Sequence, residues 1–464
     1  MREIRMLRLT RRGLETGCTV PRQTSTLPVR GVDGLLTFNT SLKSEVEVER
    51  LLDNEMEMPK KSPELLAPAG DLEKLKIAFH FGADAVYLAG KKFGLRASAN
   101  NFSTQEMAEG IALAHRLGKR VYVAVNIYAH NRDIEDMPNY LAELSSLGAD
   151  GLIVSDPGII RLVLENAPGL PLHLSTQANT TNWSSALFWA TVGVKRLVLA
   201  RELTLSEIAE ISTKVDIELE GFVHGAMCIA YSGRCLLSNY FTGRSANKGE
   251  CTHPCRWRYH LMEQTRPGVF LPIEEDDRGT YVMSSKDLCM LEHILALVNS
   301  GLMSFKIEGR MKSIHYVATV INAYRHAIDN FMINSAYIID QWLLEEVKKA
   351  GTRGFSTGFY FGQPSFEAQE LEKSARDTEA EFVGIVKESQ PEKERVIVEQ
   401  RNHFAIGDLL EVLEPRKRPW RLTLEYMEDL SGSPIEKAPH PQQLVIIRHS
   451  GVIPPNALIR KLSK

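Results

Sequence analysis

Short apolar runs alternate with longer segments of mixed character from residue 64 onward. Runs of strand length begin at residues 65, 85, 120, 151, 172, 196, 217, 281 and 304. The segments between them carry apolar residues three or four positions apart, which is the period of an amphipathic helix. Asp71, Ser103 and Asn182 stand where such helices would begin, and several of the helical patterns end at a glycine.

Repeated strand and helix units joined by short turns predict parallel strands. Because no long crossover interrupts the repetition, we expect the α/β fold of a closed (β/α)8 TIM-like barrel. Nine strand candidates are one too many for that barrel. We therefore expect one of the two candidates that flank the cysteine-rich segment, at residue 217 or 281, to belong to an inserted hairpin.

The pattern divides the chain into four parts. We predict a disordered N-terminal extension over residues 1–61, where an arginine-rich start is followed by a Thr/Ser/Pro stretch and an acidic run. The barrel domain is predicted over 62–330 with a cysteine-rich loop at 225–260, and a connector over 331–376. From 377 to 464, short alternating strands separated by turns predict a small C-terminal β-barrel domain.

Composition adds limits to this picture. With 464 residues and 44% apolar residues, the chain can bury a sizeable core. No apolar run approaches the roughly 20 residues that a membrane helix needs, so we expect no membrane partner. The net charge is −3, from 55 basic and 58 acidic residues, so a nucleic-acid partner would require a local basic patch. The sequence does not set the oligomeric state.

Four of the six cysteines fall in one polar segment rich in Gly, Ser, Asn and Thr: Cys228, Cys235, Cys251 and Cys255. Disulfides, unliganded thiols, zinc and an iron–sulfur cluster are the alternatives. No secretory signal favours disulfides, and the clustering indicates a reducing, cytoplasmic location. The six residues between Cys228 and Cys235 are too many for one zinc knuckle, so the spacing favours a [4Fe-4S] cluster over zinc.

Three stretches resemble the U32 peptidase-like family over roughly residues 62 to 464. They are ELLAPAGDLEKLKIAFHFGADAVYLAG at 64, SFKIEGRMKS at 304, and the run Glu220, Phe222, Gly225, Ala226, Met227, Cys228, Gly233, Cys235 and Ser238. Members include collagenase-like proteases and iron–sulfur proteins that hydroxylate RNA or ubiquinone precursors. Length and C-terminal domain make the chain most similar to members that 5-hydroxylate the wobble uridine of tRNA. The resemblance implies tRNA as partner and prephenate as a small acidic co-substrate.

Polar residues follow the predicted strands, and in a barrel those positions face the active site. Glu308 can accept a proton, and Arg310 can grip a carboxylate in a bidentate way. A dicarboxylate such as prephenate would need a second cation, which Arg201 or Arg96 would supply. The alternative is ordinary ion pairing at the barrel top. The full set at the strand ends is Asn126, Asp156, Gln177, Arg201, His224, Glu308 and Arg310.

Basic and aromatic residues interleave through the cysteine segment, and such a mixture is typical of single-stranded RNA binding. They are Arg234, Tyr240, Phe241, Arg244, Lys248, Arg256, Trp257, Arg258 and Tyr259. A second basic turn, Arg416 to Arg421 around Trp420, is another candidate for RNA contact. Solvated loop charges are the alternative in both places.

Two other functions stay open at this point. As a U32 peptidase the chain would cut peptide bonds, and since GxSxG and HExxH motifs are both missing, Cys228 beside His224 is the nucleophile and base to be considered. As an RNA-binding accessory without chemistry, it would use the cysteines for a structural metal.

Overall fold

The computed structural model describes residues 61–94, 101–227, 235, 237–244, 251, 252, 254, 261, 262, 270, 271, 274–276, 279–281, 286–351, 353–364 and 380–462. The predictions for the N-terminal extension, for Arg96 and for the thiols of Cys228 and Cys255 lie outside the described residues. So do the RNA contacts predicted for Arg234, Lys248, Arg256, Trp257, Arg258 and Tyr259.

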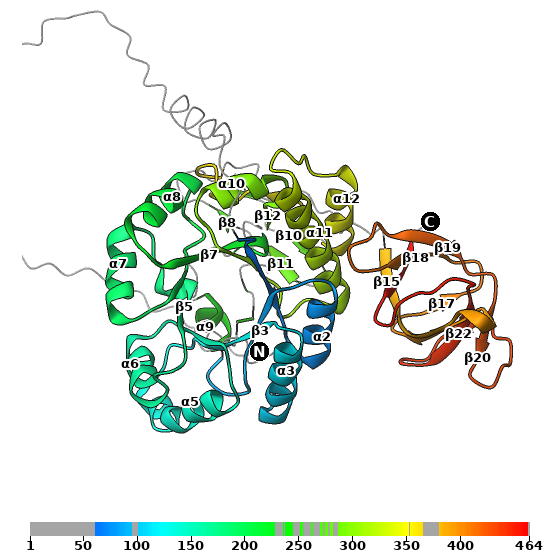
Figure 1. The fold of residues 1–464 in the computed structure, drawn as a ribbon, viewed down its shortest axis with the longest axis horizontal. Coiled ribbons are helices and arrows are strands. Elements are labelled where there is room, and N and C mark those ends of the chain that lie inside the picture. Colours follow the sequence, from blue (N-terminus) through cyan, green and yellow to red (C-terminus); the bar gives the residue numbers. More distant parts are fainter. Residues whose placement is uncertain are drawn as a thin grey trace, which may run out of the picture.

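Eight parallel strands form a closed barrel surrounded by helices (Figure 1), which confirms the predicted fold class. β13 pairs in parallel with both β1 and β7, and these two pairings close the ring. The barrel strands are β1 (Glu64–Pro68), β2 (Ala85–Leu88), β3 (Arg120–Val125), β4 (Gly151–Val154), β5 (Leu172–Leu174), β6 (Arg196–Val198), β7 (Glu218–Gly225) and β13 (Ser304–Ile307).

Helices follow these strands in order along the chain. The caps expected at Asp71, Ser103 and Asn182 are confirmed, since each side chain accepts a hydrogen bond from a backbone N–H three residues later. The helices around the barrel are α2 (Leu72–His80), α3 (Thr104–Arg116), α4 (Asn131–Ile134), α5 (Met137–Ser146), α6 (Pro157–Asn166), α7 (Trp183–Val192), α8 (Leu205–Lys214), α10 (Ile294–Asn299) and α11 (Ile314–Ile333).

Tyr281 is the one described residue of the surplus strand candidate at 281, and it lies in an inserted hairpin. Tyr281 ends β11 (Gly279–Tyr281), which pairs antiparallel with β10 (Glu274–Asp276) outside the barrel. The next strand, β12 (Asp287–Cys289), was not predicted and pairs antiparallel with the end of β7. In the connector, β14 (Phe355–Ser356) extends this edge, and α12 (Gln341–Ala350) packs against α11.

Strand residues alternate between two cores. On β2, Val86 and Leu88 belong to the large core between strands and helices, whereas Ala85 and Tyr87 belong to a small cluster inside the barrel. Buried charges share the barrel interior with that cluster: Arg196 pairs with Glu64 at 2.5 Å and with Glu220 at 3.2 Å.

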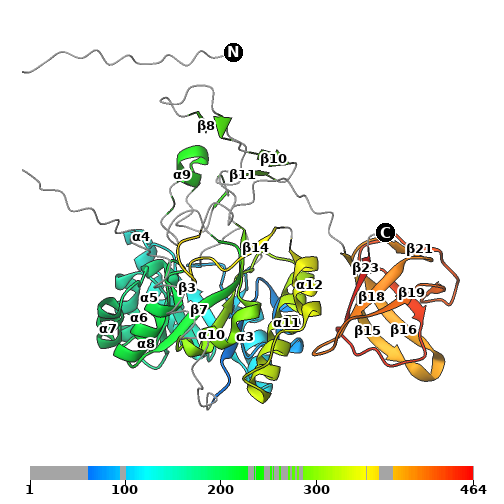
Figure 2. The same cartoon turned by 90° about the horizontal axis from the view of Figure 1, so that it is seen from above.

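The C-terminal domain is a curled antiparallel sheet with its own apolar core, which confirms the small β domain (Figure 2). Its strands are β15 (Ala380–Gln390), β16 (Arg395–Gln400), β18 (Leu409–Leu413), β19 (Trp420–Thr423), β20 (Met427–Asp429), β22 (Leu444–Arg448) and β23 (Leu458–Leu462), beside the short pair β17 (Phe404–Ala405) and β21 (Lys437–Ala438).

Buried ion pairs join the C-terminal domain to α12. The guanidinium of Arg460 on β23 lies 2.5 Å from carboxylate oxygens of both Glu346 and Glu411. Lys349 of α12 reaches the same Glu411 at 3.0 Å. Since Arg460 is 1% exposed, its charge is compensated by the carboxylates of Glu346 and Glu411 rather than by water.

Among the helices of the described residues, none combines the length and apolar composition of a membrane span.

Candidate functional site at the barrel mouth

The turn after β13 carries two of the predicted catalytic residues, and both are buried. Glu308 is 8% exposed and Arg310 is 5% exposed. The Glu308 backbone N–H donates to the carbonyl of His224 at 2.8 Å, and the Tyr316 hydroxyl donates to the Glu308 carbonyl at 2.8 Å. The turn is therefore fixed from β7 on one side and from α11 on the other.

Glycines of the family-like stretches allow close packing around this turn. A Cβ on Gly70, in the loop after β1, would lie 2.3 Å from the Arg310 carbonyl oxygen. Gly225, at the end of β7, has φ +109°, and a Cβ there would lie 2.6 Å from the Glu308 carbonyl oxygen. Thus the three stretches that resemble the family, far apart in sequence, meet at the Glu308–Arg310 turn.

A chain of contacts links Glu308 to Arg201 across the barrel interior. The hydroxyl of Tyr87 lies 3.1 Å from a carboxylate oxygen of Glu308. The Lys306 ammonium lies 4.5 Å from the centre of the Tyr87 ring and 5.5 Å from that of Phe222. The Arg201 guanidinium stacks on the same Phe222 ring at 3.9 Å. The mouth therefore combines cations with a carboxylate that a hydroxyl group orients.

Arg201 also holds the start of the cysteine segment. Its Nη1 donates to the Ala226 carbonyl at 2.9 Å, two residues before Cys228 in the chain. Arg201 is only partly exposed. Any ligand at the mouth would therefore meet a guanidinium whose position depends on this loop.

His224 is not at the mouth, although its place at the end of β7 predicted that it would be. Its ring is 2% exposed and packs against the rings of Tyr316 and Tyr324 on α11 and of Phe355 on β14. Burial lowers the pKa of His224 to about 3, so the imidazole is neutral. A general base is not expected in this environment.

His224 points away from the mouth because the pairing of β7 with β13 is irregular. Lys306 pairs with Phe222, but Ile307 pairs with His224, where regular register would select Val223. The extra residue interrupts the alternation of side chains, which turns His224 away from the barrel interior.

Two amides and a hydroxyl form a network on the other side of the mouth. Gln177 Oε1 accepts from Asn126 Nδ2 at 2.7 Å and from Ser175 Oγ at 3.1 Å, and Gln177 is 4% exposed. These contacts orient the Gln177 amide so that its NH₂ group is the end left for another acceptor. Asp156, by contrast, caps α6 by accepting from the N–H groups of Gly158 and Ile159.

Lys306 and Tyr87 are the site residues that sequence reasoning missed. Lys306 is 4% exposed and lies 2.6 Å from Glu220, deep in the barrel. Burial raises the pKa of the Glu220 carboxyl, but Lys306 and Arg196 outweigh that effect and the pKa is lowered overall. The sequence did hold a signal for them, because successive side chains of a strand point to opposite faces of the sheet. Tyr87 and Lys306 stand at the positions of β2 and β13 that face the barrel interior.

Two of the four clustered cysteines are within the described residues. Cys235 is half-buried and Cys251 is exposed. Their surroundings are tied together: Ser238 Oγ, on α9 (Leu237–Thr242), accepts from the Thr252 backbone N–H at 3.0 Å and lies 3.0 Å from Thr252 Oγ1. Cys235 comes two residues before α9 and Cys251 one residue before Thr252. The two thiols are thus carried by segments that adjoin each other, as a shared centre requires.

The aromatic pair of α9 is exposed to solvent. Tyr240 is 83% exposed and Phe241 46% exposed, and their rings lie 5.2 Å apart at nearly right angles. Figure 2 shows α9 on the same side of the barrel as β8, β10 and β11, above the strand ends.

The RNA contact predicted for the second basic turn has less support, since Arg416 pairs with Asp329 and Lys417 with Glu414.

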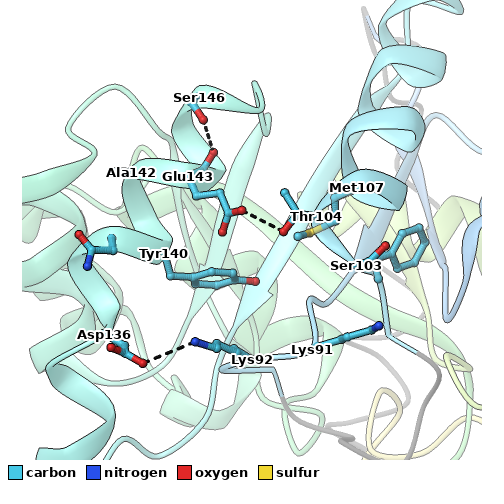
Figure 3. Close-up of a pocket in the computed structure, with 12 residues that line it drawn as sticks. Lys91, Lys92, Ser103, Thr104, Met107, Asp136, Tyr140, Ala142, Glu143 and Ser146 are labelled. Atoms are coloured by element: carbon cyan, nitrogen blue, oxygen red, sulfur yellow. Dashed lines mark hydrogen bonds and ion pairs between the residues drawn. The ribbon is translucent and has the colours of Figure 1, made fainter.

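A separate cavity of about 920 Å³ opens between α3 and α5 (Figure 3). Lys92 lies 3.5 Å from Asp136 in this cavity, and the Thr104 hydroxyl donates to Glu143. It contains none of the predicted site residues. The lining residues are Lys91, Lys92, Phe102, Ser103, Thr104, Met107, Asp136, Asn139, Tyr140, Ala142, Glu143 and Ser146.

A closed (β/α)8 barrel with buried ionisable groups at the carboxyl ends of its strands is the architecture of barrel enzymes. Comparison with known families places the chain within that class. Residues 70–370 match Peptidase family U32 and residues 378–460 match the Peptidase family U32 C-terminal domain, so the chain belongs to the U32 family.

Two curated relatives are similar over nearly their whole length, and a third over part of its length. The chain is 44% identical over 402 residues to tRNA hydroxylation protein P1 of Bacillus subtilis, covering 86% of this chain and 95% of the relative. It is 38% identical to tRNA hydroxylation protein P of Escherichia coli, covering 81% and 91%. It is 40% identical to the 23S rRNA 5-hydroxycytidine C2501 synthase of Escherichia coli, covering 57% and 39%.

Proposed function

We propose that the chain is an RNA-modifying enzyme that hydroxylates tRNA, and that its reaction is the prephenate-dependent 5-hydroxylation of the wobble uridine. The observation that carries the proposal is the 44% and 38% identity to two tRNA hydroxylation proteins across both domains. The named rRNA hydroxycytidine synthase supports the same chemistry, since it also acts on a pyrimidine of RNA.

The cationic side of the mouth suits an acidic co-substrate. Arg310 and Arg201 would bind carboxylates, Arg310 from a turn that backbone contacts fix and Arg201 from its stack on Phe222. Glu308, oriented by the Tyr87 hydroxyl, would accept a proton. The Gln177 NH₂ group would donate to a carbonyl oxygen of the pyrimidine ring, because its Oε1 is already occupied.

Cys228, Cys235, Cys251 and Cys255 would hold a [4Fe-4S] cluster. The donor set is four thiols, and the hydrogen bonds between Ser238 and Thr252 bring the Cys235 and Cys251 segments together. When bound, such a cluster would supply electron transfer. Arg201 contributes to the loop's position through its bond to Ala226.

Exposed rings on α9 would receive RNA bases. A wobble base must leave its stack to reach the mouth, and stacking on Tyr240 or Phe241 would offset the lost stacking by about 1 to 3 kcal/mol per base. Arg244, at the exposed end of the same segment, would neutralise phosphate.

The test is oxygen-free purification followed by iron and acid-labile sulfide analysis, absorbance near about 400 nm, and mass spectrometry of nucleosides from treated tRNA. We expect Cys251→Ala to lose both the colour and the hydroxyuridine. Cys289→Ala is the matched control, since that thiol lies on β12 outside the segment. Full hydroxylation by Cys251→Ala would reject the role of the cluster. Peptide cleavage without RNA hydroxylation would support the peptidase alternative instead.

A further inference from the structure

Three neighbouring barrel strands end in a network of neutral polar groups. Asn126 follows β3, Ser155 follows β4, and Ser175 and Gln177 follow β5. Gln177 Oε1 accepts from Asn126 Nδ2 at 2.7 Å, and the Ser155 hydroxyl donates to the Asn126 backbone carbonyl at 3.4 Å. In the ring of eight strands, β4 is four strands from β13, so the network lies across the mouth from the Glu308–Arg310 turn. Because the four side chains carry no charge, they suit a neutral ring rather than a carboxylate.

The Gln177 side chain is held in place and keeps one donor unused. Gln177 is 4% exposed, and within the described part of the chain its Nε2 is buried without a hydrogen-bond partner. Its backbone carbonyl accepts from the Tyr128 hydroxyl at 3.1 Å and from Asn179 Nδ2 at 3.0 Å. A buried donor without a partner is destabilising, so the site gains when a ligand brings an acceptor to it.

Asn126 determines which end of the Gln177 amide is left for a ligand. The two ends of an amide have nearly the same shape, but the oxygen accepts and the NH₂ group donates. Ser175 Oγ lies 3.1 Å from Gln177 Oε1, and a hydroxyl can pair with either end because it both donates and accepts. Asn126 Nδ2 only donates, so it selects the oxygen and leaves the Gln177 NH₂ group unused.

We propose that Asn126, by orienting the Gln177 amide, makes the enzyme select uracil over cytosine. This inference rests on the proposed function. The reacting C5–H is the same in both bases, and they differ at the neighbouring C4, where uracil carries an oxygen acceptor and cytosine an NH₂ donor. The Gln177 NH₂ group pairs with the oxygen of uracil. With cytosine, two buried donors face each other and neither has a partner.

The shape of a pyrimidine nucleotide explains why its C4 group meets a buried donor. The ribose is attached to N1, which lies opposite C4 in the six-membered ring. When a flipped base enters the mouth, the ribose and its phosphates stay outside, so the C4 substituent reaches deepest. A donor as buried as that of Gln177 is therefore met by this substituent. The C2 oxygen, beside N1, stays nearer to solvent.

The test compares two transcripts of one tRNA that differ only in having uridine or cytidine at the wobble position. With cluster-loaded protein and prephenate, mass spectrometry of the nucleosides gives the initial rate of hydroxylation for each transcript. We expect the wild type to prefer uridine by about tenfold or more, and Asn126→Asp to lower that preference by about tenfold or more. The reason is that a carboxylate at 126 accepts from the Gln177 NH₂ group and turns Oε1 toward the base.

Asn139→Asp is the matched control, because Asn139 is exposed on α5, and it should keep the wild-type preference. Gln177→Glu presents an acceptor directly and should lower the preference in the same direction as Asn126→Asp. In a Gln177→Leu background, Asn126→Asp should have no further effect on the preference, since it acts through the amide.

The proposal is overturned if neither Asn126→Asp nor Gln177→Glu lowers the preference for uridine, including through loss of hydroxylation on both transcripts. A wild-type chain that hydroxylates uridine and cytidine equally well would also overturn it, while the proposed function would stand. A wild-type chain that hydroxylates neither transcript would overturn the proposed function and this inference together.

Discussion

Gly225 shows how one missing side chain shapes the candidate site. We predict that Gly225→Ala destabilises the protein by about 2 to 4 kcal/mol, since it combines a positive φ with a Cβ placed 2.6 Å from the Glu308 carbonyl oxygen. Thermal unfolding measures the effect. Gly118→Ala is the control: its φ is +65°, but nothing lies within 4 Å of the added Cβ, so only about 1 kcal/mol is expected. Equal losses in the two variants would contradict the close-packing argument.

His224 is a buried neutral ring whose replacement should change pH dependence rather than catalysis. Its pKa is about 3 in the folded chain and 6.5 when unfolded. As pH falls, the unfolded state therefore binds a proton at His224 before the folded state does. The free energy of unfolding that the neutral ring contributes above about pH 6.5 is lost as pH falls toward 3. Between about pH 7 and pH 5 the loss is about 2 kcal/mol.

We predict that His224→Phe removes that part of the pH dependence and retains tRNA hydroxylation. Phenylalanine keeps the edge contacts to Tyr316 and Tyr324. The measurements are denaturant unfolding at both pH values and the yield of hydroxyuridine. Loss of hydroxylation in a stable, cluster-loaded variant would restore His224 to the catalytic residues.

On the proposed function, Arg310 would serve co-substrate binding and not cluster binding. We predict that Arg310→Ala raises the KM for prephenate at least tenfold, since hydrogen bonds to charged groups contribute about 1.5 to 3 kcal/mol, and leaves the iron content unchanged. Arg132→Ala, an exposed arginine of α4, is the control. An unchanged KM would reject Arg310 as the carboxylate partner.

At the scale of elements, the barrel strands are held together by an interior ion network. Arg196 of β6 connects Glu64 of β1 with Glu218 and Glu220 of β7. Arg196 is 3% exposed, so its removal takes one of two cationic partners from each buried carboxylate and leaves Glu64 with Arg120 and Glu220 with Lys306. We predict that Arg196→Ala destabilises the barrel by about 3 to 5 kcal/mol.

Arg120→Ala provides the comparison for Arg196, because Arg120 also pairs with Glu64, at 2.7 Å, but its side chain is 44% exposed. The expected loss there is about 1 kcal/mol or less. Urea unfolding of both variants measures the difference. Similar values would show that the interior pairs contribute no more than surface ones.

Strands and helices could be predicted from periodicity because burial on the barrel wall requires it. All eight barrel strands coincide with apolar runs, and helix caps at Asp71, Ser103 and Asn182 stand where polar side chains precede helical patterns. The site was predicted only in part. Glu308 and Arg310 follow a regular strand, but the register shift that turns His224 outward depends on pairing between β7 and β13, which lie some 80 residues apart in the chain.

At the scale of the whole molecule, the two domains are joined by charge as well as by apolar contact. Arg460 and Glu411 of the C-terminal domain meet Glu346 and Lys349 of α12, and all except Lys349 are at most 5% exposed. Burial tends to raise the pKa of Glu411, but Arg460 and Lys349 outweigh it and lower the pKa to about 2. This carboxyl therefore stabilises the docked arrangement only while it is ionised.

We predict that the domain contact weakens in acid. The pKa of Glu411 is lower in the folded chain than its ordinary value of 4.5, so its contribution is complete above about pH 4.5 and is lost as pH falls toward 2. Glu411→Gln should reproduce the acid effect at neutral pH, because Arg460 then loses one of its two carboxylates. Limited proteolysis between residues 364 and 380 should become faster. Glu392→Gln, an exposed carboxyl at the far turn of the same sheet, should cleave at the wild-type rate. Equal rates for both variants at neutral pH would show that apolar contacts alone hold the domains together.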